Sequence, residues 1–147
     1  MIKAKKSLGQ NFLVDEIVLN KIVETVEIKD QIILEVGPGT GNLTTLILKK
    51  KPKKFYVVEK DSNLTQYLSE EFNNQIHIIN EDILKFDENK FLGEKNKIIV
   101  FGNLPYNIST EILCKWILNL DGNNFLFNKL ILMFQKEVAN RIIANFN

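Results

Sequence analysis

Short apolar runs alternate with amphipathic segments along most of the chain. The runs are rich in Ile and Val and are four or five residues long, which is typical of buried strands. We predict strands at Ile32–Val36, Phe55–Val58, Ile76–Ile79, Ile98–Phe101 and Leu130–Phe134. Because most of these strands are separated by helical patterns, the sequence predicts an α/β fold with a doubly wound, mostly parallel sheet.

The intervening segments carry apolar residues at helical spacing. Asp15 and Ser109 are candidate N-caps of two such helices. The predicted apolar stripes are Ile17, Val18, Ile22, Val23 and Val26 after Asp15; Leu43, Leu46 and Ile47; and Ile112, Leu113, Trp116, Ile117 and Leu120 after Ser109. Further helices are predicted from Asp61 or Ser62 to Phe72 and from Gln135 to Phe146. The stretch between Asp82 and Ile98 is polar and loop-like, and Asp121–Asn124 is a turn cluster.

The first four predicted strands all end in a glycine or polar signal. The loop Gly37–Gly41 follows the first strand, and Glu59, Asp82 and Asn103 stand at the ends of the next three. Ligands of parallel α/β sheets bind outside the carboxyl ends of the strands, so these groups should converge. Glycines let a cofactor approach the backbone. Glu59 could accept from two ribose hydroxyls, and Asp82 could accept from an adenine amino group.

Two other nucleotide sites fit the glycine loop less well. A dinucleotide fingerprint needs glycine at the sixth loop position, where this chain has Asn42. A phosphate loop needs a Gly-Lys-Ser/Thr sequence, which does not follow here. The pattern therefore favours a nucleoside bound without a pyrophosphate, and S-adenosylmethionine is such a ligand.

The stretch Gly102–Ser109 carries the groups suited to holding an amino-bearing base. The Asn103 side-chain oxygen can accept from an exocyclic amino group, and Pro105 fixes φ and lacks a backbone donor. Tyr106 offers a stacking face, worth about 1–3 kcal/mol per base. The alternative interpretation is a polar turn between strand and helix with a core Tyr.

Length, charge and composition limit the kinds of protein that this chain can be. The length of 147 residues predicts one globular domain. The formal net charge of only +1 predicts no strong overall electrostatic field. The single Cys114 excludes an internal disulfide, and His77 lacks metal-ligating partners at a suitable spacing, so we expect no metal. Without a signal peptide or long apolar span, we expect a cytoplasmic protein that does not enter a membrane. The lysines at 3–6 and 49–54 could be solvated surface or could contact phosphates.

Several motifs together resemble the ribosomal RNA adenine N6-dimethyltransferases (KsgA type). They cover nearly the whole chain in the family's order. The matching segments are Ser7–Leu13, Glu35–Thr44, Glu59–Asp61, Glu81–Leu84, Gly102–Thr110 and Phe134–Ala139.

The resemblance implies a Rossmann-like S-adenosylmethionine-dependent methyltransferase fold, with residues 1–147 as a cofactor-binding catalytic domain. It implies transfer of methyl groups to N6 of two adjacent adenosines near the 3′ end of small-subunit rRNA. We also expect the protein to be a monomer. The implied cofactor contacts are Asn11, Leu13, Gly37, Gly39, Glu59, Asp82, Ile83 and Asn103. The implied target-base contacts are Asn103, Leu104, Pro105 and Tyr106. Phe12 is interpreted as a core residue.

The family's chains continue beyond this one, into further strands and a small helical domain. We therefore expect a domain incomplete at its C-terminus, whose fifth strand exposes an apolar edge. Two alternatives stay open: a large-subunit rRNA adenine methyltransferase conferring macrolide resistance, and a non-catalytic rRNA-binding or assembly factor.

Overall fold

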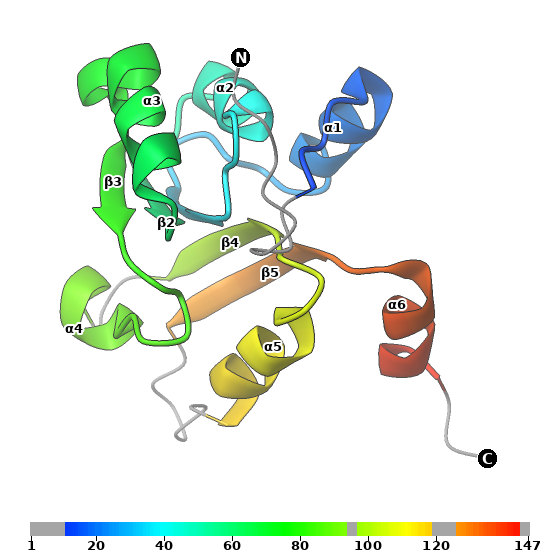
Figure 1. Ribbon diagram of the computed structural model, residues 1–147. Coiled ribbons are helices and arrows are strands. Elements are labelled where there is room, and N and C mark those ends of the chain that lie inside the picture. Colours follow the sequence, from blue (N-terminus) through cyan, green and yellow to red (C-terminus); the bar gives the residue numbers. More distant parts are fainter. Residues whose placement is uncertain (1–10, 94–96, 119–125, 145–147) are drawn as a thin grey trace.

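A computed structural model describes residues 11–93, 97–118 and 126–144 (Figure 1). The lysines at 3–6, the first part of the Ser7–Leu13 motif, Leu120, the Asp121–Asn124 turn and the end of the last predicted helix lie outside these residues. The described part forms one parallel sheet with strand order β3-β2-β1-β4-β5. The strands are β1 (Ile32–Val36), β2 (Lys54–Glu59), β3 (His77–Asn80), β4 (Ile98–Asn103) and β5 (Phe127–Met133).

The register places the polar strand ends along one edge of the sheet. Val36, at the end of β1, pairs with Val58 on β2 and with Gly102 on β4. Glu59 pairs with Asn80 at the end of β3. The four tips therefore meet at the carboxyl edge, where the predicted polar groups follow or end the strands.

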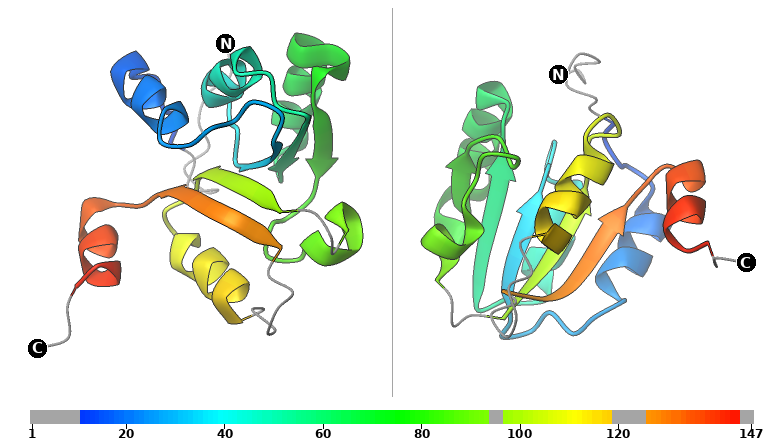
Figure 2. Two further views of the ribbon diagram at one scale, coloured as in Figure 1. Left: turned by 180° about the vertical axis from the view of Figure 1, so that it is seen from behind. Right: turned by 90° about the horizontal axis from the view of Figure 1, so that it is seen from below.

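Helices cover both faces of the sheet (Figures 1 and 2). One face carries α1 (Glu16–Val23), α2 (Asn42–Lys49) and α3 (Ser62–Phe72), and the other carries α4 (Glu88–Leu92) and α5 (Ser109–Leu118). Alternate strand residues serve the two cores, so Ile33 packs on the first face and Leu34 on the second. A short 3-10 helix (Asn73–Gln75) follows α3, and α6 (Lys136–Ile142) follows β5.

Most of the predicted elements are confirmed, with differences at their ends. Asp15 and Asp61 are N-caps, since their carboxylates accept from Ile17 and Asn63 amides respectively. Ser109 is not a cap: it is the first residue of α5, and its hydroxyl donates to the Tyr106 carbonyl at 3.4 Å. The predicted loop between Asp82 and Ile98 contains a helix, α4, that the sequence pattern missed.

The predicted stripes of two helices are partly wrong. In α1 the core-facing residues are Leu19 and Val23, whereas Ile17 is 70% exposed. Val18 is also exposed, as is Ile117 in α5. The spacing of apolar residues alone was compatible with more than one buried face of each helix. Packing against the sheet determined which face is buried.

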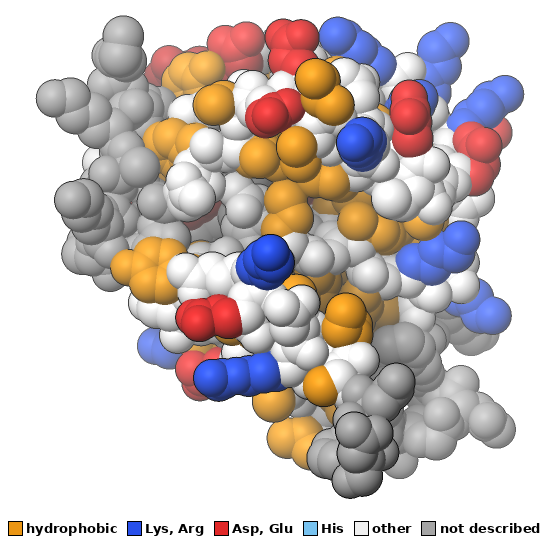
Figure 3. Space-filling model, turned by 90° about the vertical axis from the view of Figure 1, so that its right-hand side faces the viewer, with side chains coloured by type: hydrophobic (Ala, Val, Ile, Leu, Met, Phe, Trp, Pro, Cys, Tyr) orange, Lys and Arg blue, Asp and Glu red, His pale blue; other side chains and the backbone are white. Residues whose placement is uncertain are grey.

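The expected apolar edge is confirmed in the described part of the chain. β5 pairs with β4 and is the last strand in the sheet order, and its residues from 130 to 133 are half-buried. On this side of the molecule, apolar side chains gather between charged ones (Figure 3). Exposed apolar residues also occur in and just after α6, at Ile142 and Ile143. Within the described residues, no helix is long and apolar enough to cross a membrane.

Candidate functional site

A cleft of about 180 Å³ lies at the carboxyl edge of the sheet. The ends of β1, β2 and β4, the loop after β3 and the segment before α1 all contribute to its lining. Most of the predicted site residues line it: Asn11, Gly37, Gly39, Glu59, Asp82, Ile83, Asn103 and Pro105. The structure therefore brings together groups from five separate parts of the sequence.

Three predicted residues do not line this cleft. Leu13 lines a smaller adjoining cavity that also contains Glu35 and Gly37. Leu104 is buried in the core, with 6% of its surface exposed. Tyr106 is 54% exposed, which excludes the alternative of a core Tyr. Its ring is open to solvent next to cleft residues Pro105 and Asn107.

The glycine loop packs closely against the end of β4 and the segment before α1. Gly37 and Gly39 have φ values of +69° and +60°, in the left-handed region that favours glycine. A Cβ at Gly37 would lie 3.1 Å from the Asn103 carbonyl oxygen. A Cβ at Gly39 would lie 2.9 Å from the ring of Phe12. Side chains at these positions would therefore fill the space between the loop and its neighbours.

Asn103 has one end of its carboxamide occupied. Its Nδ2 donates to the backbone oxygen of Asn11 at 2.7 Å, across 92 residues of sequence. This bond determines which end of the amide is nitrogen, so Oδ1 lies on the opposite side. The bond thus holds the side chain in place, with Oδ1 as the acceptor that it carries.

Glu59 is a buried carboxylate at the end of β2. Its Oε1 accepts from the Asp61 amide at 2.9 Å, and 8% of the residue is exposed. Burial raises the pKa of the Glu59 carboxyl, and backbone amides including those of Asp61 and Gly39 partly oppose this rise. A carboxylate oriented by backbone amides can accept from hydroxyl groups in the cleft.

Asp82 is paired with a cleft lysine. Lys60 Nζ lies 2.8 Å from Oδ2, and the Leu84 amide donates to Oδ1 at 3.0 Å. The hydrogen bond from Lys60 is the main reason that the pKa of Asp82 is lowered. Asp82 therefore remains an ionised acceptor.

A second buried acid, Glu35, lies below the glycine loop. The Thr44 hydroxyl of α2 donates to its Oε2 at 2.7 Å, and 1% of Glu35 is exposed. Burial is the main reason that the pKa of Glu35 is raised to about 8; the Thr44 hydrogen bond opposes this rise and the nearby Glu59 charge adds to it. The hydrogen bond from Thr44 thus ties Glu35 to α2 next to the glycine loop.

Some cleft residues were not assigned a role from sequence. Phe12, interpreted as a core residue, is half-buried and lines the cleft, because Gly39 leaves room for its ring. Lys60, Asn107 and Ile108 also line it. These three residues lie inside the Glu59–Asp61 and Gly102–Thr110 motifs, and that position was the sequence signal that could have indicated a place in the cleft. Within the described residues, no group of three or more His, Cys, Asp or Glu side chains could hold a metal ion.

Comparison with known proteins identifies similar sequences across the whole chain. The family model described as "Ribosomal RNA adenine dimethylase" matches residues 1–147. A curated relative from Pelagibacter ubique, named "Ribosomal RNA small subunit methyltransferase A", is 64% identical over 146 residues. That alignment covers 99% of this chain and 55% of the relative. The chain thus spans about half the length of the curated relatives it matches.

Solved structures confirm the predicted fold class. A dimethyladenosine transferase from Plasmodium falciparum has a TM-score of 0.76 and 31% identity, over 92% of this chain and 47% of that one. The 23S rRNA methyltransferase ErmE has a TM-score of 0.72 and 28% identity, over 88% and 50% of the two chains. The sheet therefore has the Rossmann-like architecture of S-adenosylmethionine-dependent methyltransferases.

Proposed function

The chain belongs to the ribosomal RNA adenine dimethylase family, and we propose from this premise that it forms the catalytic domain of a small-subunit rRNA adenine dimethyltransferase. The reaction would place two methyl groups from S-adenosylmethionine on N6 of each of two adjacent adenosines near the 3′ end of the rRNA. The main structural support is the single cleft that joins the glycine loop, Glu59, Asp82 and Asn103. We expect a cytoplasmic monomer.

The cleft residues fit the chemistry of the methyl donor. Glu59 is a buried acceptor suited to the ribose hydroxyls, and the ionised Asp82 is suited to the adenine amino group. Ile83 beside it also lines the cleft and is the third proposed contact to the methyl donor in this region. The glycine loop has no Cβ atoms to occupy the space around Gly37 and Gly39, so its backbone can approach the donor.

The remaining proposed contacts lie on the segment before α1 and in the glycine loop. Asn11 borders the cleft, and Leu13 borders the adjoining cavity. We assign the backbone at Leu13 and Gly37 to the region between the methionine and ribose groups. The sulfonium would supply an activated methyl group, so the protein's main tasks are binding and orientation.

The segment after β4 would hold the target adenine. Adenine N6 is a weak nucleophile because its lone pair is delocalised into the ring. If Asn103 Oδ1 and the Leu104 carbonyl accept the two N6 hydrogens, the nitrogen can become pyramidal and direct its lone pair at the methyl group. Pro105 would fix this backbone, and Tyr106 would stack on the base, which must leave its helix or loop to enter. As the bond from N6 to the methyl carbon forms, the bond from that carbon to sulfur breaks and S-adenosylhomocysteine leaves, and the proton released from the product nitrogen can pass to water.

Small-subunit rRNA is favoured over large-subunit rRNA by the degree of similarity. The small-subunit relative from Pelagibacter ubique is 64% identical, whereas the large-subunit enzyme ErmE is 28% identical. The test is labelled-methyl transfer from S-adenosylmethionine to unmethylated small subunits, large subunits and naked rRNA, followed by mapping of the modified bases. Methyl groups on large subunits would support the resistance alternative. Cofactor binding without transfer to any of these RNAs would favour a binding or assembly role.

The decisive variant is Asn103→Ala. We expect loss of methyl transfer, because the N6 acceptor is removed, while affinity for S-adenosylhomocysteine stays within about tenfold of wild type. Isothermal titration measures the affinity, and Asn63→Ala, at an exposed position on α3, is the matched control. Near-normal transfer by Asn103→Ala would refute the proposed role of this side chain.

A further inference from the structure

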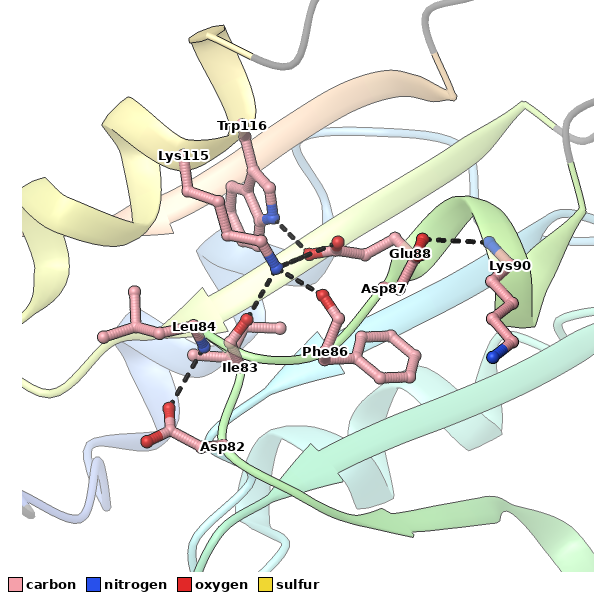
Figure 4. A network of polar contacts seen from close by, with 9 residues as sticks. All are labelled: Asp82, Ile83, Leu84, Phe86, Asp87, Glu88, Lys90, Lys115 and Trp116. Carbon is pink, nitrogen blue, oxygen red and sulfur yellow. Dashed lines mark hydrogen bonds and ion pairs between the residues drawn. The ribbon is translucent and has the colours of Figure 1, made fainter.

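Lys115 of α5 reaches the turn that follows Asp82 (Figure 4). Its Nζ donates to the backbone oxygens of Ile83 at 2.7 Å and Phe86 at 2.5 Å. The same Nζ lies 2.9 and 3.0 Å from the two carboxylate oxygens of Glu88 at the start of α4. The neighbouring Trp116 Nε1 donates to Glu88 Oε1 at 2.6 Å. One helix therefore makes five polar contacts to residues 83–88.

These contacts are sheltered from solvent. The exposed fractions of the Lys115 and Glu88 side chains are 17% and 8%, and Trp116 is 2% exposed. An ammonium group carries three donors and can satisfy both carbonyls while pairing with the carboxylate. Charge-assisted hydrogen bonds of this kind are stronger than those between neutral groups. The arrangement is therefore suited to holding a turn in one conformation.

The same turn forms a wall of the cleft. Asp82, Ile83 and Leu84 line the cleft, while the Ile83 and Phe86 side chains pack into the core with Trp116. The turn is closed by the Lys85 and Phe86 amides, which donate to the Asp82 carbonyl at 2.8 and 3.0 Å. Lys115 thus contacts the carbonyl oxygen of a residue that lines the cleft.

Another part of the cleft lining is continuous with the helix that bears Lys115. The segment from Asn103 to Ile108 contributes Asn103, Pro105, Asn107 and Ile108 to the cleft and leads directly into α5. Lys115 lies on α5 and bonds the turn after Asp82. Helix α5 is therefore connected to two parts of the cleft lining, through the chain to the Asn103–Ile108 segment and through Lys115 to the turn after Asp82.

We propose that Lys115, paired with Glu88 and Trp116, is a positioning residue. It holds the Asp82–Leu84 part of the cleft lining in a fixed position relative to α5, so that the cleft can bind the adenosyl group. The identity of that ligand rests on the proposed function. Without the ammonium group, the Ile83 and Phe86 carbonyls lose a shared donor and the turn samples other conformations. If the competent conformation falls to about a tenth of the population, the apparent Kd rises about tenfold.

The primary variant is Lys115→Met, which keeps the length of the side chain and removes its donors. Lys90→Met is the matched control, because it removes the same charge from an exposed position on α4. Hydrogen exchange at the amides of residues 84–86 reports the turn directly, without any ligand. Isothermal titration with S-adenosylhomocysteine and with 5′-methylthioadenosine, which lacks the amino-acid part, reports the adenosyl wall.

A double variant separates positioning from general stability. Lys115→Met alone leaves the Glu88 carboxylate without its cationic partner, which destabilises the fold. Adding Glu88→Gln removes that charge and keeps an acceptor for Trp116. We expect the double variant to recover much of the thermal stability but not the affinity, because the two carbonyls still lack a donor.

We expect Lys115→Met to increase exchange at 84–86 and to weaken both ligands by about the same factor of ten, with Lys90→Met unchanged. Unchanged exchange at the turn would overturn the inference, as would recovery of affinity in step with stability in the double variant. Failure of the wild-type chain to bind either ligand would refute the proposed function instead. The exchange measurement would still decide whether Lys115 holds the turn.

Discussion

Substitution of the buried acid Glu35 by Gln should change how stability depends on pH. Glu35 is 1% exposed and accepts a hydrogen bond from Thr44, which Gln can also accept. Burial raises the pKa of Glu35 from 4.5 to about 8. Between these values the unfolded chain has released the proton that the folded chain retains. The stability associated with Glu35 is therefore fully present below about pH 4.5 and is lost as pH rises to about 8.

The magnitude follows from proton linkage. The free energy of unfolding should fall by up to about 1.4 kcal/mol per pH unit across this window, because one more proton is bound in the folded state. The whole shift in the pKa of Glu35 corresponds to about 5 kcal/mol of unfolding free energy, which is large beside the roughly 5–15 kcal/mol stability of an ordinary domain. In Glu35→Gln this contribution is absent.

Urea unfolding at pH values from 5 to 9 measures the effect. The fluorescence of Trp116, the chain's single Trp, is a suitable probe because its side chain is buried. The difference in unfolding free energy between Glu35→Gln and wild type should shift in favour of the variant as pH rises. Glu24→Gln, at an exposed position, removes the same charge and should show no such trend. Parallel pH profiles for wild type and Glu35→Gln would refute the reasoning.

Because the pKa of Glu35 is raised, this buried acid contributes less to stability as pH rises, and its hydrogen bond to Thr44 could be made by Gln as well. Its position below the glycine loop, beside the cavity that contains Leu13 and Gly37, points to a role in the site. We therefore expect Glu35→Gln to be more stable at pH 8 and to bind S-adenosylhomocysteine more weakly. Retained affinity would show that the acid has no part in binding.

Three further substitutions test separate parts of the structure. Gly41→Ala should lower the unfolding free energy by about 2 kcal/mol or more, because φ is +83° and the new Cβ would lie 2.5 Å from the Phe72 ring; equal urea midpoints would contradict this. Lys60→Met should bring the pKa of Asp82 up towards its ordinary value, since the Lys60 hydrogen bond is the main cause of the lowered pKa. NMR titration of the Asp82 carboxyl carbon measures this pKa, and an unchanged midpoint would contradict the prediction. Tyr106→Ala should leave stability within about 0.5 kcal/mol, because the ring is 54% exposed. It should slow methyl transfer roughly tenfold or more through lost stacking, and equal rates would argue against a stacking role.

The alternation of apolar runs and amphipathic segments determined much of this protein. Strands rich in Ile and Val with helices between them leave a parallel sheet as the arrangement that buries both faces. That arrangement places the residues at the strand ends along one edge. The sequence could therefore predict that Gly37, Glu59, Asp82 and Asn103 would meet, although they are far apart in the chain. The caps at Asp15 and Asp61 were predictable because capping is a contact within one turn.

Only the tertiary structure decided the features that depend on distant contacts. Helix α4 lies in a polar stretch without an apolar stripe. Its Glu88 is buried because Lys115 and Trp116, 27 and 28 residues later, satisfy the carboxylate. Strand β4 extends to Asn103 because that residue pairs with Met133 on β5.

The detailed lining of the cleft was decided in the same way. Phe12 reaches it because Gly39 leaves space for the ring, and Asn103 is oriented by the backbone oxygen of Asn11, 92 residues earlier. Local pattern specifies which residues are apolar and how they repeat, and so determines the elements and their order. Which buried polar group finds which partner depends on where the folded chain brings donors and acceptors together, and a buried group without a partner would be costly.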